Sequence, residues 1–414
     1  MIDVIVIGGG PAGLSAANTC ARNGLQVLVL DEFMKPGGRL LGQLHEEPDG
    51  EWWNGIKEAS VLASNADNLG VDVKLGVSVH NLQSDKGNWI VFTNKGKFRS
   101  TNLLLATGAA ETPLPLPGWT LPGVMSIGAA QVMTNVHRVK VGEKGVIVGM
   151  NILSFAIMRE LRLAGIQVDQ VLLPPRNELS TESSNPLKII DDLSEAAHLA
   201  PGFIMKWGAK LMRVKALRKI GLSFYPSNGF KIWDVPIQLK QAVVEILGDK
   251  KVEGVKVVKL NTKGDPIPGA EKIVEADFVC IAGGLYPLVE LAAISGCPFH
   301  YIPELGGHIP LHNERMETPV DGLYVSGNIT GIESAKIAMA QGVVAGLSIS
   351  QKVTKRIKLE EMTKAIEHVH DVRAKSIIQF HPDIQKGRKK IEKLWNHYYQ
   401  EKKQTKIPSI ENSI

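Results

Sequence analysis

The fold is decided by one stretch near the start of the chain, Val4-Ile5-Val6-Ile7-Gly8-Gly9-Gly10-Pro11-Ala12-Gly13. Its four apolar residues predict a buried strand, and its glycines predict a tight turn. A helix is expected near Leu14 to Asn23, and a second strand from Val27 to Leu30. Strand, turn, helix and strand in this order form a βαβ unit, the opening of a nucleotide-binding α/β domain.

The glycines of this turn fit the pattern GxGxxG, and each has its own role. Gly8 permits the tight turn, Gly10 lets the backbone approach a pyrophosphate, and Gly13 lets the helix lie close to the strand. Phosphates would then lie at the helix N-terminus, where unpaired N–H groups favour an anion. Asp31 follows 18 residues after Gly13, where a carboxylate accepts hydrogen bonds from an adenosine ribose. The spacing therefore predicts a bound dinucleotide.

A second strand–turn–helix opening begins at residues 145–149 and continues through a helix at 155–164 into a strand at 168–173. Its turn, Gly149-Met150-Asn151-Ile152-Leu153-Ser154, keeps only the first glycine. The Asn151 side chain obstructs the surface on which an NAD(P) phosphate would lie. We therefore expect a second Rossmann-like domain whose sequence argues against NAD(P). A different ligand or a partner subunit could occupy that face.

Two glycine- and proline-rich crossings divide the chain. The first is Glu111 to Gly123, and the second is the Gly283-Gly284 turn after the apolar residues 277–282. They predict an α/β fold with a discontinuous first domain, residues 1–112 and 280–350, and a second domain, residues 113–279. Residues 351–414 are expected to form a basic helical tail. Strands are also expected at 88–92 and 97–105, whereas residues 174–235 show no clear pattern.

The composition indicates the cellular location to expect and excludes some kinds of chemistry. The 414 residues are 44% hydrophobic and 21% charged, without the run of about 18 apolar residues that a membrane span needs. The first strand begins too close to Met1 for a signal peptide, so a cytoplasmic protein is expected. Cys20, Cys280 and Cys297 include no CxxC pair, which removes the dithiol of disulphide reductases. The net charge of +5 is concentrated in residues 352–406, and we interpret it as a solvated helical face, not a nucleic-acid site.

From Pro36-Gly37-Gly38-Arg39-Leu40 onward the sequence resembles the glutathione-reductase and thioredoxin-reductase type of flavoprotein, in the FAD-dependent pyridine nucleotide-disulphide oxidoreductase-like superfamily. Segments at 104–108, 282–287 and 322–328 resemble three further segments that recur in that superfamily in the same order. The resemblance implies FAD, bound by Gly8, Gly10, Pro11, Ala12, Gly13, Asp31, Glu32, Gly38, Arg39, Gln43, Val79, Ala106, Thr107, Gly108, Gly327, Asn328 and Ser334.

The last of these segments departs from the family pattern at Asn328, where an aspartate is usual. An amide can still hydrogen-bond a ribityl hydroxyl, so the position keeps its place in the site. A helix is expected over Glu333 to Leu347, and its N-terminus could face the pyrimidine end of the flavin. There it would stabilise negative charge without a side chain.

A narrower resemblance lies in residues 117–124 and 128–131, Pro-Gly-Trp-Thr-Leu-Pro-Gly-Val and Gly-Ala-Ala-Gln. This crossing is similar to that of the alpha-type FAD subunits of sarcosine oxidase, opine oxidase, hydrogen cyanide synthase and dye-linked proline or hydroxyproline dehydrogenases. It implies oxidation of a C–N bond in an amine, amino acid or imino acid, alongside a second flavoprotein subunit. The tail contains no cysteine, so it cannot ligate a [2Fe–2S] cluster by thiolates.

Two other functions stay open, an NAD(P)H-dependent flavin reductase and a non-catalytic electron-relay subunit. No catalytic base is assigned, although Gln43, His45, Trp52, Trp53 and Lys336 could face the flavin.

No metal is expected, because Pro310 separates His308 from His312 and argues against a helix that presents both as ligands. A tail helix with Trp395 and Tyr398 could dock a partner or pack on its own domain.

Overall fold

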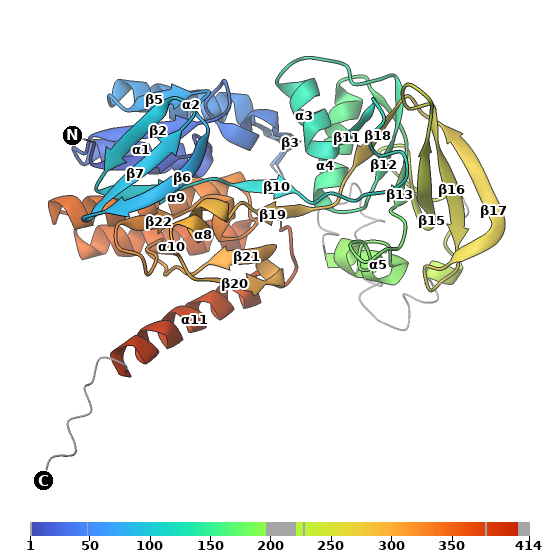
Figure 1. Cartoon of the computed structure of the whole chain (residues 1–414). Helices are drawn as coiled ribbons and strands as arrows, with labels where there is room; N and C mark the ends of the chain where they lie inside the picture. Colours follow the sequence, from blue (N-terminus) through green and yellow to red (C-terminus); the bar gives the residue numbers. More distant parts are fainter. Residues whose placement is uncertain (1, 48, 196–220, 227, 377–378, 405–414) are drawn as a thin grey trace, which may run out of the picture.

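The computed structural model describes residues 2–47, 49–195, 221–226, 228–376 and 379–404, which fold into two α/β domains joined by a narrow crossing (Figure 1). The expected α/β fold with two Rossmann-like units and a C-terminal helix is confirmed.

The first domain is built on a parallel sheet in the order β22-β9-β1-β2-β5. Its strands are β1 (Val4–Ile7), β2 (Val27–Asp31), β5 (Asp72–Leu75), β9 (Asn102–Leu105) and β22 (Leu323–Val325). All four residues of β1 are buried, as are all four of β9. Such continuous apolar strands indicate a sheet covered on both faces.

Alternate residues of β1 point to these two covering layers. Val4 and Val6 pack against helices, and Ile5 and Ile7 pack against an antiparallel sheet and a short helix. The helices of the first layer are α1 (Pro11–Arg22), α2 (Gly55–Asn68), α9 (Ala335–Thr354) and α10 (Leu359–Lys375). The second layer contains β6 (Val79–Asp85), β7 (Asn88–Thr93), β8 (Gly96–Ser100) and α8 (Glu290–Ile294).

The second domain is a mixed sheet in the order β11-β18-β12-β13-β15-β16-β17, with β14 paired to β15. Its strands are β11 (Val124–Ser126), β12 (Lys144–Val148), β13 (Gln167–Leu173), β14 (Phe230–Ile232), β15 (Val235–Leu247), β16 (Gly254–Leu260), β17 (Pro266–Glu275) and β18 (Phe278–Ile281). Its helices are α3 (Ile127–Asn135), α4 (Ile152–Leu163) and α5 (Pro186–Glu195). The pairs β15–β16 and β16–β17 are antiparallel, so this edge extends the parallel core.

The two domains are joined where β10 (Ala109–Glu111) pairs antiparallel with β19 (Leu285–Pro287) (Figure 1). β18 still pairs inside the second sheet, so the chain returns to the first domain after Ile281 and not at residue 280. α9 likewise runs to Thr354, past the expected end of the first domain at residue 350. In other respects the domain limits stay a prediction.

One expected strand was wrong. Residues 97–105 form two strands, because the chain leaves the antiparallel sheet after Ser100 and joins the parallel sheet at Asn102. The apolar residues of both strands merge into one run, which hides this change of sheet. Residues 174–235 lie partly outside the described residues, at 196–220 and 227; their described part contains α5 and β14.

The shorter elements surround the join and the tail. They are η1 (Gly38–Gly42), β3 (Leu44–Glu46), β4 (Trp52–Asn54), β20 (Phe299–Ile302), η3 (Pro303–Leu305), β21 (Gly307–Pro310), η4 (Gly327–Thr330) and α11 (Ile384–Gln404). Ile384 and Ile391 of α11 pack on the β20–β21 hairpin, and Trp395 and Tyr398 lie against the same cluster. The tail therefore packs on its own domain along this face; residues 405–414 lie outside the described part. None of the helices in the described ranges is long and apolar enough to cross a membrane.

Candidate active site

A cavity of about 1690 Å³ lies at the carboxyl ends of the first domain's strands and extends to the second domain. All but one of the residues that the sequence predicts to bind the cofactor line this cavity, including Asp31, Glu32, Val79, Gly108 and Asn328. The exception is Gly13, which faces the turn itself. Ligands of open α/β sheets bind at this edge, so the cavity is the candidate site.

The first glycine turn shows three different reasons for glycine. A Cβ on Gly13 would lie 1.9 Å from the carbonyl oxygen of Gly8, so Gly13 is required by packing. Gly8 has a φ of +104°, and its Cβ would lie 2.3 Å from the carbonyl oxygen of Ala106. At Gly10 a Cβ would meet no atom within 4 Å. Protein packing therefore does not explain Gly10, whereas a ligand at the N-terminus of α1 would.

Two backbone N–H groups hold the carboxylate of Asp31 in place. Its Oδ1 accepts from the backbone N–H of Phe33 at 2.7 Å, and its Oδ2 accepts from Gly9. A carboxylate has about four acceptor positions, so two remain for ribose hydroxyls. Burial raises the pKa of Asp31, while these two N–H groups oppose the shift.

The second Gly-Gly pair packs directly on the first turn. The backbone N–H of Gly37 donates to the carbonyl oxygen of Gly9 at 2.7 Å. Gly38 has a φ of +54°, and its Cβ would lie 3.1 Å from the Cα of Gly10. The two glycine segments thus form one narrow backbone cradle.

Asn328 presents a donor to the cavity where the family pattern has an acceptor. Its Oδ1 accepts from the backbone N–H of Glu333 at 3.2 Å, so its NH₂ group is the part left for a ligand. The neighbouring Gly327 donates its backbone N–H to Gln341 Oε1 at 3.0 Å. These bonds fix the η4 turn before α9 begins.

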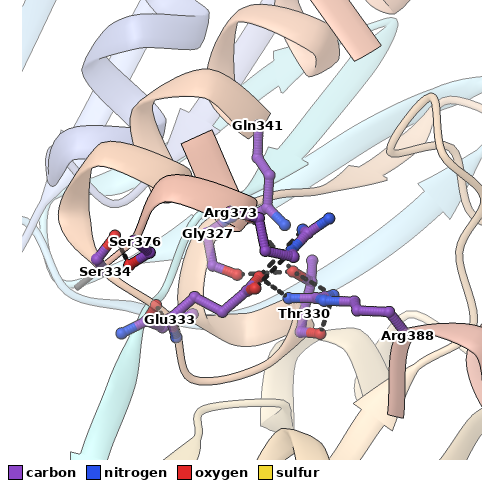
Figure 2. A network of polar contacts seen from close by, with 9 residues as sticks. Gly327, Thr330, Glu333, Ser334, Gln341, Arg373, Ser376 and Arg388 are labelled. Carbon is purple, nitrogen blue, oxygen red and sulfur yellow. Dashed lines mark hydrogen bonds and ion pairs between the residues drawn. The ribbon is translucent and has the colours of Figure 1, made fainter. Parts of the chain in front are cut away.

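Glu333, just before α9, is the centre of a buried ionic network (Figure 2). Its side chain is 4% exposed and accepts from Arg373 Nε at 2.6 Å and from Arg373 Nη2 at 3.1 Å. It also pairs with Arg388 Nη2, and Arg388 Nη1 donates to the carbonyl oxygen of Thr330 at 2.7 Å. Burial alone would raise the pKa of Glu333, but the charges and hydrogen bonds of Arg388 and Arg373 lower it below its ordinary value.

This network ties two tail helices to the turn that precedes α9, since Arg373 comes from α10 and Arg388 from α11. Sequence patterns did not reveal these three residues. The arginines lie 40 and 55 positions after Glu333, and no local spacing connects them. α9 begins at Ala335, two residues later than expected, and its N-cap Ser334 makes no side-chain cap.

In the second glycine turn, side chains cap the N-terminus of α4. Asn151 Oδ1 accepts from the backbone N–H of Ser154 at 3.0 Å, and Ser154 Oγ accepts from the backbone N–H of Asn151 at 2.9 Å. Asn151 Nδ2 also donates to the carbonyl oxygen of Ala282 at 3.0 Å. This reciprocal pair is a capping box, which uses N–H groups that a bound phosphate would need.

A buried carboxylate lies on the cavity wall between the domains. Glu160 of α4 is 4% exposed and accepts from Asn135 Nδ2 at 2.7 Å, Gln131 Nε2 at 2.9 Å and the backbone N–H of Leu44 at 3.2 Å. Burial raises the pKa of Glu160 to about 7, although the three hydrogen bonds oppose the shift. Glu160 therefore joins the second domain to β3 and titrates near neutral pH.

Replacing Glu160 by glutamine is expected to remove a pH dependence of stability. Because the pKa of Glu160 rises from 4.5 to about 7, the folded state keeps a proton that the unfolded state has lost. The wild-type protein should lose about 3 kcal/mol of unfolding free energy from this group as the pH rises from 4.5 to 7. Urea unfolding at both pH values measures the difference. Equal pH slopes for E160Q and wild type would contradict this role.

Of the residues expected to face a flavin, Gln43, His45, Trp53 and Lys336 line the cavity, and Trp52 does not. The Trp52 side chain is 45% exposed.

All three cysteines are buried and unpaired. Within the described ranges, no group of three or more His, Cys, Asp or Glu side chains could hold a metal ion.

Residues 2–183 match the family model of the pyridine nucleotide-disulphide oxidoreductases. An opine oxidase subunit from Agrobacterium tumefaciens (strain Ach5) is 28% identical over 84% of this chain and 65% of its own length. The alpha subunit of sarcosine oxidase from Corynebacterium sp. (strain P-1) is 31% identical over 83% of this chain and 32% of its own length. This chain therefore spans less than two thirds of either relative.

Among solved structures, L-proline dehydrogenase from P. horikoshii has the same fold, with a TM-score of 0.64 at 18% identity. The match covers 89% of this chain and 58% of that one. The resemblance expected from the sequence is thus confirmed. Residues 2–183 are therefore similar to the pyridine nucleotide-disulphide oxidoreductases, and the chain is related to FAD-type oxidoreductases that include opine oxidase and sarcosine oxidase subunits.

Proposed function

We propose that this chain binds FAD in the cavity and oxidises a C–N bond of an amine, amino acid or imino acid. One contrast between the two glycine turns carries the proposal. Space is left beside Gly10 for a phosphate, whereas the Asn151 side chain lies at the corresponding turn and accepts from the backbone N–H of Ser154 in α4. One dinucleotide site is open and the other is closed by its own side chains, which favours FAD without NAD(P)H.

In this proposal the adenosine ribose lies at Asp31 and the pyrophosphate lies at the N-terminus of α1. The Gly37–Gly38 segment covers the adenosine side, and Asn328 donates to the ribityl or phosphate region. The flavin ring then lies toward the N-terminus of α9, near Ser334. The cavity lining supports this placement, because Asp31, Gly38, Asn328 and Ser334 all line the cavity.

Bound FAD would supply a two-electron acceptor for a hydride from a C–H bond beside nitrogen. The chain's own contribution is position and charge. The cavity between the domains would hold the donor against the ring, and the uncapped N-terminus of α9 would stabilise negative charge there. The hydride leaves only when the donor nitrogen is neutral, so a donor that enters as an ammonium must first give its proton to a carboxylate or to water in the cavity.

We also propose that the partner of this chain is a second flavoprotein subunit. The relatives support this, because the opine oxidase and sarcosine oxidase chains are both named as subunits of their enzymes. The cysteine-free tail provides no thiolate ligands for a [2Fe–2S] cluster within residues 351–414. A cytoplasmic location stays a prediction of the sequence.

The purified flavoprotein should be mixed anaerobically with L-proline, hydroxyproline, sarcosine and an opine, and separately with NADH and NADPH. At least one C–N donor should bleach the visible absorbance of the flavin faster than either nicotinamide. Rapid bleaching by NADPH alone would contradict the proposal and would favour a flavin reductase. Bleaching by a C–N donor only after a partner is added would instead favour an electron-relay subunit.

A further inference from the structure

A cluster of polar and aromatic side chains joins the β3–β4 hairpin to the first turn of α9 on the cavity wall. Glu47 Oε1 accepts from Lys336 Nζ at 2.7 Å and pairs with His45 Nε2 at 3.2 Å. The indole N–H of Trp53 donates to Gln43 Oε1 at 3.3 Å. All five residues line the cavity. Lys336 is the second residue of α9, so the cluster lies beside the proposed flavin end.

The acid of this cluster is Glu47 and the base is Lys336, and each has hydrogen-bonding capacity that its described contacts do not use. The Glu47 side chain is only 16% exposed, and its described contacts all go to Oε1, which leaves Oε2 without a partner among the described residues. The Lys336 side chain is 45% exposed, so two of its three N–H groups can reach a ligand. Burial lowers the pKa of His45, which leaves its ring neutral near pH 7.

An aromatic face adjoins these two charges. The ammonium group of Lys336 lies 4.9 Å from the ring centre of Trp53, and the His45 ring lies 6.0 Å from the same ring. A small aliphatic group or a saturated ring would pack against such a surface. The wall therefore offers a cation that can bind an anionic group, a carboxylate that can bind a cationic group, and an apolar surface, all within one cluster.

Another cation of the same wall, Arg159, is already engaged. It pairs with Glu46 at 2.5 Å, and its guanidinium lies 5.2 Å from the ring of Trp52 and 5.3 Å from that of Trp233. Lys336 is more exposed and is opposed by a carboxylate that still has a free oxygen. Of these two cations, Lys336 is the one better placed to meet a carboxylate.

We infer that Lys336 and Glu47 form a subsite for a zwitterionic amino or imino acid, with the substrate carboxylate on Lys336 and its ammonium on Glu47. This inference rests on the proposed function and narrows it from amines in general to carboxylated donors. Trp53 contacts the aliphatic part of the substrate. Lys336 and Glu47 act as binding and positioning residues, since they hold the donor nitrogen and its neighbouring carbon beside the flavin.

The test measures binding without turnover. The FAD-loaded protein is reduced with dithionite under anaerobic conditions and titrated in a calorimeter with L-proline, sarcosine and glycine. The matched amines without a carboxylate are pyrrolidine, dimethylamine and methylamine. The variants are K336M and E47Q, and K352M is the control. Lys352 lies at the other end of α9 and pairs with the exposed Asp321 at 2.6 Å, outside the cavity lining.

In the wild type, at least one acid should bind more tightly than its matched amine. K336M should weaken that acid by about ten- to a hundredfold, the range for losing a hydrogen bond to a charged group, and should leave the amine unchanged. E47Q should weaken both members of the pair, and K352M neither. The subsite is overturned if no acid binds, if acids and amines bind equally, or if K336M matches K352M.

Flavin bleaching of the oxidised protein separates the two proposals. Bleaching by amines and acids with equal affinities would keep the oxidase function and remove the subsite. Acid-selective binding that depends on Lys336, without bleaching by any C–N donor, would keep the subsite and remove the function.

Discussion

Replacing Glu333 by glutamine is expected to lower the free energy of unfolding by about 3–5 kcal/mol, because removing one partner of a buried ion pair strands the other. Here two guanidinium groups, those of Arg373 and Arg388, would keep their charge with no carboxylate between them (Figure 2). Their side chains are 7% and 12% exposed, so water cannot replace the lost contacts. FAD affinity should fall as well, since the backbone N–H of Glu333 fixes Asn328.

The control is Glu360→Gln in α10, which breaks an exposed pair with Lys364. Such surface pairs contribute about 0–1 kcal/mol, so E360Q should unfold at nearly the wild-type urea concentration. If E333Q unfolds at the same concentration as E360Q, the tail does not hold the turn before α9 through this network.

The loss in E333Q should depend on pH with a defined sign. The pKa of Glu333 is lowered from 4.5 in the folded protein, so its stabilisation is complete above that value and disappears as the pH falls through the folded pKa. At acid pH the wild-type side chain becomes neutral, like glutamine. The difference between the two proteins should therefore be largest near pH 7 and should narrow below pH 4.5. A constant difference over this range would assign the effect to packing and not to charge.

The sequence could predict the first domain's opening because its signals are local. The strand, turn and helix at residues 4–23 lie in one continuous stretch, and parallel strands bring their carboxyl ends to one edge. That geometry collects the glycine turn, Asp31 and Asn328 around one cavity. Contact of these residues with FAD stays a prediction, although the free space at Gly10 supports it.

The polar networks could not be predicted, because each one joins side chains from distant elements. Glu160 accepts from Gln131 and Asn135 of α3 and from the backbone of Leu44 in the first domain. A pairing of this kind depends on how two domains meet, and helical or strand periodicity does not record it. The Glu333 network has the same origin.

For the second glycine turn, the sequence pattern argued against NAD(P), but it gave only part of the physical reason. The sequence indicates only that Asn151 obstructs a phosphate. In the structure Asn151 and Ser154 also form a capping box, which satisfies the backbone N–H groups of both residues and so competes with an anion for this terminus. The capping pair was readable only as Asn-x-x-Ser, which is too common to interpret alone.

Two alanine substitutions in the first turn should separate folding from FAD binding. In Gly13→Ala, the new Cβ would lie 1.9 Å from the carbonyl oxygen of Gly8, so α1 must move away from β1. Overpacking typically costs about 1–3 kcal/mol, and this contact with fixed backbone belongs at or above the upper end. The variant should unfold at lower urea concentration even without FAD.

Gly10→Ala should leave folding stability nearly unchanged and weaken FAD binding. Gly10 has a φ of −79°, and its Cβ would meet no protein atom within 4 Å. The apoprotein should unfold within about 1 kcal/mol of wild type, the usual difference between glycine and alanine at a helix N-cap. FAD affinity should nevertheless fall about a hundredfold or more, equal to about 3 kcal/mol, since the methyl group occupies the pyrophosphate space. Fluorescence titration of the apoproteins with FAD measures this loss. Wild-type affinity in G10A would move the pyrophosphate away from α1, and normal stability in G13A would show that α1 can shift without cost.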